Sequence, residues 1–198
     1  MMDGATAQSM RQKGLNYHLN WGATIPRLRQ MADGKLEEVR GENNLSLLTS
    51  LAIALWKENV RECKILATML MPPDEMLPEV ADIWMEQTPT LEIAEQAAFN
   101  LYQHLPYAAD KAFEWLASSD DLPQICGYHV FSRLFMRRQE INERGINEFL
   151  DQAIAALQSS NASLQKAAMQ AVIHFADLSL MHQRLAASAT RRIGLSFV

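Results

Sequence analysis

The chain has few of the residues that interrupt or cross-link a fold. Its 198 residues include only 8 glycines, 7 prolines and 2 cysteines. So little glycine and proline excludes collagen-like and low-complexity disordered chains. Cys63 and Cys126 lie far apart without a CxxC spacing, and a cytosolic chain with its own core rarely needs a disulfide. We therefore predict a domain with its own apolar core, in which both cysteines are buried and unlinked.

Several signatures of membranes, metals and cofactors are missing as well. No run approaches the ~20 apolar residues of a membrane span, and the first residues, Met1 to Arg11, include Asp3 and lack a signal-peptide core. The five histidines show neither HExxH nor i, i+4 spacing, and glycine-rich phosphate loops and Gly-x-Ser-x-Gly elbows are absent. We expect a cytoplasmic protein with no metal, no cofactor and no membrane contact.

The net charge of −5 is unevenly distributed along the chain. Residues 1–40 hold six basic against four acidic side chains, residues 41–128 hold four against fourteen, and residues 129–198 hold eight against five. Neutralisation of phosphates by Lys and Arg drives most affinity for nucleic acids. The two basic ends therefore favour DNA as a partner, whereas the acidic middle favours a basic protein.

Apolar residues recur at helical spacing throughout the chain. The stretch 45–56 is an example, with leucines, an alanine and Trp56 forming one wide apolar face. Alternating runs of Val, Ile and Thr, typical of strands, are missing. Short breaks, among them one at Gly34, divide the pattern into roughly ten helices with tight connections. The predicted fold class is all-α.

A repeat is visible within this pattern. Trp56, Trp84 and Trp115 each stand near the end of a helix and precede a polar turn and a second amphipathic helix, and Leu157 marks a degenerate fourth copy. This arrangement is typical of HEAT or armadillo repeats, which stack into a curved superhelix of antiparallel helix pairs. We predict one such domain over residues 1–198, with the three tryptophans buried between helix layers. The second helices, expected to line the concave face, span 60–71, 91–102, 123–138 and 162–175.

Two short motifs resemble a known family. The run 22–29, with Gly22, Pro26, Leu28 and Arg29, is similar to the Gly-Val-x-x-Pro-x-Leu-Arg pattern of the bacterial DNA alkylation-repair glycosylases with HEAT-like repeats. Leu55-Trp56 followed by the run 61–67 resembles that family's next signature, a Leu-Trp pair followed by a Glu and, a few residues later, a Leu-Ala pair. The motifs cover about residues 15–75. Beyond them the resemblance rests on the helix pattern.

The resemblance implies hydrolysis of the N-glycosidic bond of cationic, alkylated purines in DNA. A carboxylate would stabilise the oxocarbenium-like sugar, and aromatic faces would hold the cationic base. Glu95 falls at the family's catalytic Asp position, and Glu92 is the second candidate carboxylate. Thr90 stands where the family has a Trp, and Leu122 and Ile125 where it has an aromatic and an Arg. These departures predict weak or absent base excision.

Basic side chains supply the candidates for phosphate contact. For both the acidic and the basic candidates a structural role is the alternative interpretation. The helix dipole favours acidic residues in the first turn, such as Glu92 and Glu95, and basic residues in the last turn. The candidate nucleic-acid contacts are Arg27, Arg29, Arg133, Arg137 and Arg138.

Three hypotheses follow from the sequence. The first is a divergent relative of the alkylpurine DNA glycosylases that still binds nucleic acid. The second is a scaffold that binds a protein partner in the concave groove of its repeats. The third is an active glycosylase that uses Glu95 with an aromatic partner not recognised in the motifs.

Overall fold

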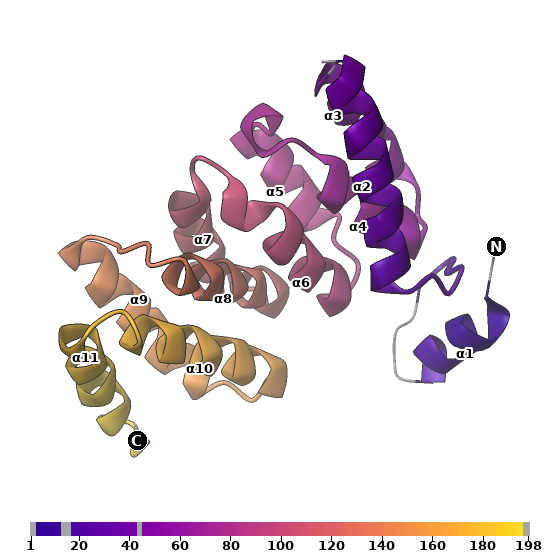
Figure 1. The fold of residues 1–198 in the computed structure, drawn as a ribbon. Coiled ribbons are helices and arrows are strands. Elements are labelled where there is room, and N and C mark those ends of the chain that lie inside the picture. The colour runs from indigo at the N-terminus through magenta and orange to yellow at the C-terminus, as the bar shows by residue number, and fades with distance from the viewer. Residues whose placement is uncertain (1–2, 13–16, 43–44, 196–198) are drawn as a thin grey trace. The chain divides into compact units, whose positions relative to one another are not determined.

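The computed structural model describes residues 3–12, 17–42 and 45–195, and the regular secondary structure of these residues is helical (Figure 1). The all-α prediction is confirmed. Among the described residues there is no strand, only an isolated bridge between Leu19 and Val60, and no helix is long and apolar enough to cross a membrane. The α-helices are α1 (Gly4–Gln12), α2 (Ile25–Glu42), α3 (Leu45–Lys57), α4 (Arg61–Leu70), α5 (Pro78–Glu86), α6 (Leu91–Asn100), α7 (Ala108–Leu116), α8 (Asp121–Met136), α9 (Glu143–Leu157), α10 (Ala162–Ala176) and α11 (Leu180–Arg191), with the short 3-10 helices η1 (Pro73–Glu75) and η2 (Tyr102–His104).

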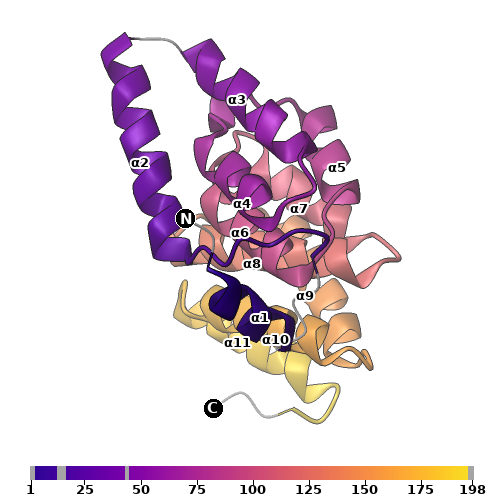
Figure 2. The same cartoon turned by 90° about the vertical axis from the view of Figure 1, so that its right-hand side faces the viewer.

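The helices fall into two compact units, residues 1–106 and residues 107–198, called unit 1 and unit 2 below. Unit 1 contains α1 to α6, and in it α2 packs against α3 and α4 while α4 packs against α6 (Figure 2). Unit 2 contains α7 to α11, and in it α8 packs against both α7 and α10. That residues 1–198 act as one domain stays a prediction.

The predicted repeat corresponds to four helix pairs, α3–α4, α5–α6, α7–α8 and α9–α10. Each pair is joined by three or four residues, at 58–60, 87–90, 117–120 and 158–161. Trp56, Trp84 and Trp115 are only 2%, 3% and 6% exposed, which confirms their predicted burial. Trp56 and Trp84 stack with their ring centroids 4.2 Å apart, so consecutive repeats of unit 1 pack through the same side chain.

One predicted break is wrong. Gly34 lies inside α2, which continues without interruption. A glycine inside a helix costs only about 1 kcal/mol relative to alanine. Leu28, Ala32 and Val39, each at most 2% exposed, form a buried stripe that runs past Gly34 and holds the helix together. Burial of this stripe outweighs the local preference of glycine for a turn.

The core of unit 2 is a cluster of phenylalanines. Phe149 is fully buried, with its ring centroid 5.1 Å from that of Phe135, 5.3 Å from that of Phe131 and 5.4 Å from that of Phe175. These rings come from α8, α9 and α10 and join the inner and outer helices of this unit. The cysteines are also buried, Cys63 in unit 1 and Cys126 in unit 2, and neither forms a disulfide, as predicted.

Candidate nucleic-acid interface and active-site region

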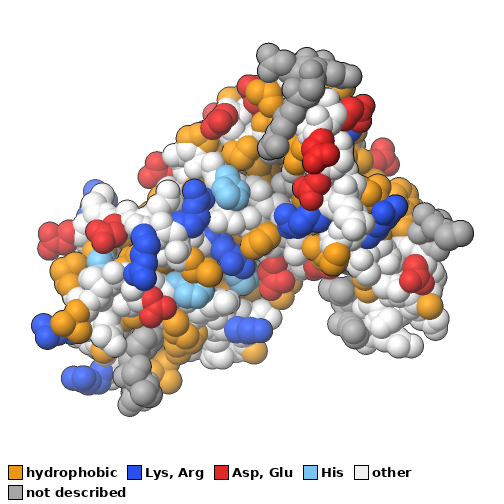
Figure 3. Space-filling view, in the orientation of Figure 1, with side chains coloured by type: hydrophobic (Ala, Val, Ile, Leu, Met, Phe, Trp, Pro, Cys, Tyr) orange, Lys and Arg blue, Asp and Glu red, His pale blue; other side chains and the backbone are white. Residues whose placement is uncertain are grey.

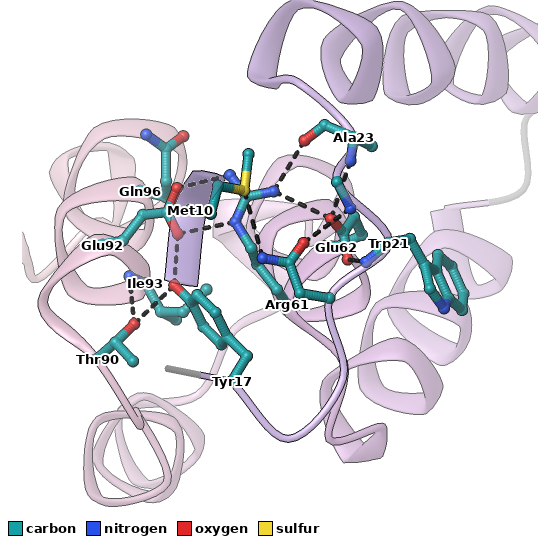
Figure 4. A network of polar contacts seen from close by, with 12 residues as sticks. Met10, Tyr17, Trp21, Ala23, Arg61, Glu62, Thr90, Glu92, Ile93 and Gln96 are labelled. Atoms are coloured by element: carbon teal, nitrogen blue, oxygen red, sulfur yellow. Dashed lines mark hydrogen bonds and ion pairs between the residues drawn. The ribbon is translucent and has the colours of Figure 1, made fainter. Parts of the chain in front are cut away.

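The two motif segments that carry the family resemblance contact each other in unit 1 (Figure 4). The guanidinium of Arg61 donates a hydrogen bond to the carbonyl oxygen of Ala23 at 2.8 Å. The carboxylate of Glu62 accepts hydrogen bonds from the backbone N–H groups of Trp21 at 3.0 Å and Ala23 at 3.1 Å. Both charged side chains are 1% exposed and pair with each other at 3.1 Å. Residues at the start of α4 therefore hold the segment that leads into α2.

The backbone conformation explains why the first motif has a glycine at position 22. Gly22 has a φ of +75°, a region that L residues other than glycine rarely adopt. A Cβ at this position would also overlap the carbonyl oxygen of Asp3. The turn at Gly22 places the backbone N–H of Ala23 on Glu62. The motif thus encodes a turn and its anchor rather than a catalytic group.

Glu92, one of the two candidate carboxylates, belongs to the same network. It accepts hydrogen bonds from Arg61 at 2.6 and 2.8 Å, one on each carboxylate oxygen, and a further one from the hydroxyl of Tyr17. Burial alone would raise the pKa of Glu92, but the hydrogen bonds from Arg61 and Tyr17 hold this pKa below its usual value. Glu92 is therefore an ionised group that holds α6 against α4, and its oxygens are engaged within the fold.

Thr90 also has a structural role. It is the N-cap residue of α6, where its hydroxyl oxygen accepts a hydrogen bond from the backbone N–H of Ile93, and it lies 2.8 Å from the hydroxyl of Tyr17. This is the position at which the family resemblance led us to expect a tryptophan. The threonine provides a helix cap there instead of an aromatic surface.

Glu95 lies on the exposed face of α6, three residues after Glu92. Phe99 follows Glu95 by one helical turn on the same face and is 40% exposed. The guanidinium of Arg29, from α2, lies 5.6 Å from the centroid of the Phe99 ring and donates a hydrogen bond to Asn100 at 2.9 Å. Unit 1 thus brings a carboxylate, an aromatic ring and one predicted phosphate contact to neighbouring positions. The motifs gave no indication of Phe99.

The remaining candidate arginines differ in their surroundings. Arg27 is exposed on α2 and donates a hydrogen bond to Gln30. Arg138 has a φ of +61° and donates to the carbonyl oxygens of Asp177 and Leu178, at the C-terminal end of α10. A basic side chain at this end donates hydrogen bonds to carbonyl groups that have no partner within the helix, and its positive charge interacts favourably with the helix dipole. Arg138 therefore stabilises the fold, whereas Arg137, beside it, is exposed.

Arg133 belongs to a group of basic side chains on α8 and α10 of unit 2. His129 lies one turn before Arg133 on α8, and Lys166 on α10 is close enough to act on the same histidine. Burial, then the positive charges of Arg133 and Lys166, lower the pKa of His129 to about 4. His174 hydrogen-bonds Ser132 at 2.7 Å nearby. Figure 3 shows basic and histidine side chains mixed over these two helices.

We call His129, Arg133 and Lys166 the cationic cluster. Two of its members were missed by the sequence analysis, although the i, i+4 spacing of His129 and Arg133 is a signal that places them on one helical face. Lys166 comes from another helix and has no such signal. Among the described residues, no three His, Cys, Asp or Glu side chains gather as a metal site.

The positions of the family's aromatic and Arg in unit 2 carry apolar side chains, Leu122 and Ile125. Ile125 is 3% exposed and is part of the core, and Leu122 is half-buried at the start of α8. An apolar side chain at Ile125 contributes packing and offers no charge to phosphate or sugar. The unit 2 part of the site implied by the resemblance is therefore replaced by apolar side chains, of which Ile125 belongs to the core.

Comparison with known proteins identifies the family. The family model of the DNA alkylation repair enzyme matches residues 1–177. The chain belongs to this family. Among solved structures, it is similar to a member of a family of proteins related to the HEAT-like repeat DNA glycosylases with affinity for branched DNA structures, with a TM-score of 0.79, 16% identity, and coverage of 100% of this chain and 80% of that one. The likeness shows a shared HEAT-like repeat fold. No curated protein matches the chain.

Proposed function

We propose that this alkylation-repair family member binds DNA, branched DNA included, through the cationic cluster on α8 and α10, and excises alkylated bases weakly or not at all. The observation that carries the proposal is the cluster itself, in which Arg133 and Lys166 lie close enough to act on one histidine from two different helices. Two cations on helices that pack against each other can contact phosphates of a nucleic-acid backbone. The affinity of the structural neighbour for branched DNA supports the choice of partner.

The state of His129 adds to this argument. Burial is the largest cause of the lowered pKa of His129, but Arg133 and Lys166 both contribute, so two positive charges act on one imidazole, and a phosphate would relieve their repulsion. Unit 2 as a whole has nine basic and nine acidic side chains, so the cluster is a local concentration and not a general basic surface. A local concentration of this kind can bind phosphate although the chain carries a net charge of −5.

The test is salt-dependent binding by the double variant Arg133→Gln, Lys166→Gln. Each lost phosphate contact lowers the slope of log affinity against log salt by roughly one, so the double variant is expected to lose about two. Fluorescence anisotropy with a duplex and with a three-way junction, each at several salt concentrations, measures the affinity and its slope. Arg144→Gln, an exposed arginine on α9, is the matched control and is expected to bind like the wild type. An unchanged slope in the double variant would contradict the proposal.

Base excision by Glu95 is a second candidate. The observation in its favour is Phe99, an exposed aromatic ring one turn from Glu95 on α6. This ring is a candidate for the aromatic partner that the motifs did not reveal. Release of methylpurine from methylated duplex DNA, abolished by Glu95→Gln, would establish this activity.

A protein partner is the third candidate, and it also has an observation in its favour. A cavity of about 340 Å³ in unit 1 is mostly apolar, with Leu36, Leu48, Met69, Leu70 and Pro72 in its lining. Apolar concave surfaces of this kind accept side chains of a partner. The cytoplasmic location expected from the sequence is part of the same proposal for all three candidates.

A further inference from the structure

A second cavity of unit 1 lies between α2 on one side and α4, α6 and η2 on the other. It measures about 380 Å³, within the range of small-ligand pockets, and its lining includes Arg29, Asp33 and Phe99. Ala32, Leu36 and Met69 add apolar side chains to the lining, and Asn100 and Gln103 add polar ones. Every lining residue belongs to unit 1, so the cavity is complete within that unit.

The cationic wall of this cavity is held in place. Asn100 accepts the hydrogen bond from Arg29 at 2.9 Å, and it donates in turn to the buried hydroxyl of Thr68 at 3.0 Å and to Gln96 at 3.3 Å. The Arg29 guanidinium also lies 5.6 Å from the centroid of the Phe99 ring. A planar cation fixed near an aromatic ring is a surface on which a flat ring stacks with little loss of side-chain entropy.

The charges of the cavity distinguish a base from a phosphate. Among the Lys, Arg, Asp and Glu side chains of the lining there is one cation, Arg29, and one anion, Asp33. A phosphate would be repelled by Asp33, whereas the amino groups of a base can donate to this carboxylate. The carbonyl and ring nitrogens of the base can accept from Arg29. The apolar part of the lining suits the face of a base and offers no hydrogen bond to a phosphate.

We infer that this cavity, lined by Arg29, Asp33 and Phe99, receives a single unstacked nucleobase of DNA. The inference rests on the proposed function, since it adds a base site in unit 1 to phosphate contacts in unit 2. Branch points and bulges expose unstacked bases that fully paired duplex does not, and proteins hold such bases on aromatic and guanidinium planes. The cavity therefore gives a physical basis for preferring branched over uninterrupted duplex DNA.

The test uses two DNAs of matched sequence, each labelled with 2-aminopurine, a fluorescent adenine analogue whose emission falls when it stacks. In one the analogue is a single-base bulge, and in the other it is paired within a duplex. The full chain is titrated into each. For the wild type we expect the bulge to bind more tightly than the duplex and to change its emission on binding, because the base moves into the cavity.

Phe99→Leu is the main variant, since it removes the aromatic face of an exposed side chain and keeps its apolar character. Loss of one stacked base is expected to weaken binding of the bulge about tenfold and to leave the duplex unchanged. Trp21→Leu is the matched control, because Trp21 is 37% exposed, does not line the cavity and has its ring directed away from the polar network (Figure 4). It is expected to bind both DNAs like the wild type, and circular dichroism checks that both variants are folded.

The outcomes separate this inference from the proposed function. Equal binding of the bulge by Phe99→Leu and the wild type overturns the inference, as does an equal loss in Trp21→Leu. If the double variant Arg133→Gln, Lys166→Gln binds both DNAs normally while Phe99→Leu binds the bulge more weakly, the proposed phosphate contacts of the cationic cluster are wrong and the base site is supported. If the wild type binds neither DNA, both are overturned.

Discussion

Unit 1 and unit 2 use different interactions to stabilise the same kind of helix pair. Unit 1 buries an ionic network in which Arg61 contacts both Glu62 and Glu92, and it carries nine basic against fourteen acidic side chains. Unit 2 buries a phenylalanine cluster around Phe149 and has equal numbers of basic and acidic side chains. The repeat architecture therefore accommodates a buried ionic network beside the apolar core of unit 1, provided that each buried polar group has its partners.

The difference has consequences for function. In unit 1 the buried charges fix the relative positions of α2, α4 and α6, which carry Arg29, Glu95 and Phe99. In unit 2 the aromatic core fixes α8 against α10, while Arg133 and Lys166 on these helices stay accessible to solvent. In the two proposed sites, polar positioning would serve the base-sized cavity of unit 1, and aromatic packing would serve the phosphate-binding surface of unit 2. The predictions below test this division, from the largest expected effect to the smallest.

Base excision gives the largest expected effect. Unit 1 keeps a carboxylate at Glu95, but Thr90 is a helix cap and Ile125 of unit 2 is a core residue, so two groups of the family pattern are missing. Losing electrostatic contacts of this kind costs roughly 10²–10³ in rate each. We expect the purified protein to release little or no methylpurine from methylated duplex DNA, measured beside an active family enzyme. Robust release that depends on Glu95 would refute this division of roles.

Removal of the central ring of unit 2 should cost about 3–5 kcal/mol of unfolding free energy. Phe149→Ala deletes a fully buried ring that contacts three other phenylalanines, and it leaves a cavity. Urea unfolding followed by circular dichroism measures the loss. The exposed Ile173 on α10 is the control, and Ile173→Ala should change the free energy by less than about 0.5 kcal/mol. A small loss in Phe149→Ala would show that the cluster is not the core of this unit.

Arg61→Met should destabilise unit 1 by a similar amount, about 3 kcal/mol, because buried carboxylates lose their cation. The pH dependence separates this variant from Phe149→Ala. In the wild type the pKa of Glu92 is lowered, so its contribution is present above the ordinary carboxyl pKa and is lost as the pH falls through the lowered value. In the variant Glu92 has no arginine and takes up a proton more readily. The deficit, which is the difference in unfolding free energy between the wild type and Arg61→Met, should therefore narrow on acidification.

Urea unfolding at pH 7 and near pH 4.5 measures this narrowing. Lys35→Met is the control, since Lys35 forms an exposed pair with Glu38 and such pairs contribute little. A deficit that does not change with pH would mean that packing, and not ionic pairing, explains the role of Arg61.

His129 gives the smallest expected effect, on the order of 1 kcal/mol near pH 5. Its pKa of about 4 lies below the ordinary 6.5, so the unfolded chain binds a proton that the folded chain does not. The stability of the wild type should therefore fall as the pH decreases from about 6.5 towards 4, and His129→Gln should remove this part of the decrease. Thermal unfolding across this range measures the effect. His18→Gln, at an exposed histidine of unit 1, should behave like the wild type.

The sequence alone predicted the features that depend on local pattern. Helical periodicity gave the all-α class, and the repeated Trp-turn-helix pattern gave four helix pairs with Trp56, Trp84 and Trp115 buried. Two motifs indicated the family that the comparison then confirmed. These features are readable because an amphipathic helix carries its own period of 3.6 residues, whatever the rest of the chain does.

Only the tertiary structure decided which side chains meet. The pairing of Arg61 with Glu92, the approach of Arg29 to Phe99 and the closeness of Lys166 to His129 each join different helices. The same is true of Gly34, where packing of the buried face of α2 prevailed over a local turn preference. Contacts of this kind depend on how helix faces pack, and residues far apart in sequence carry no local period that reports it.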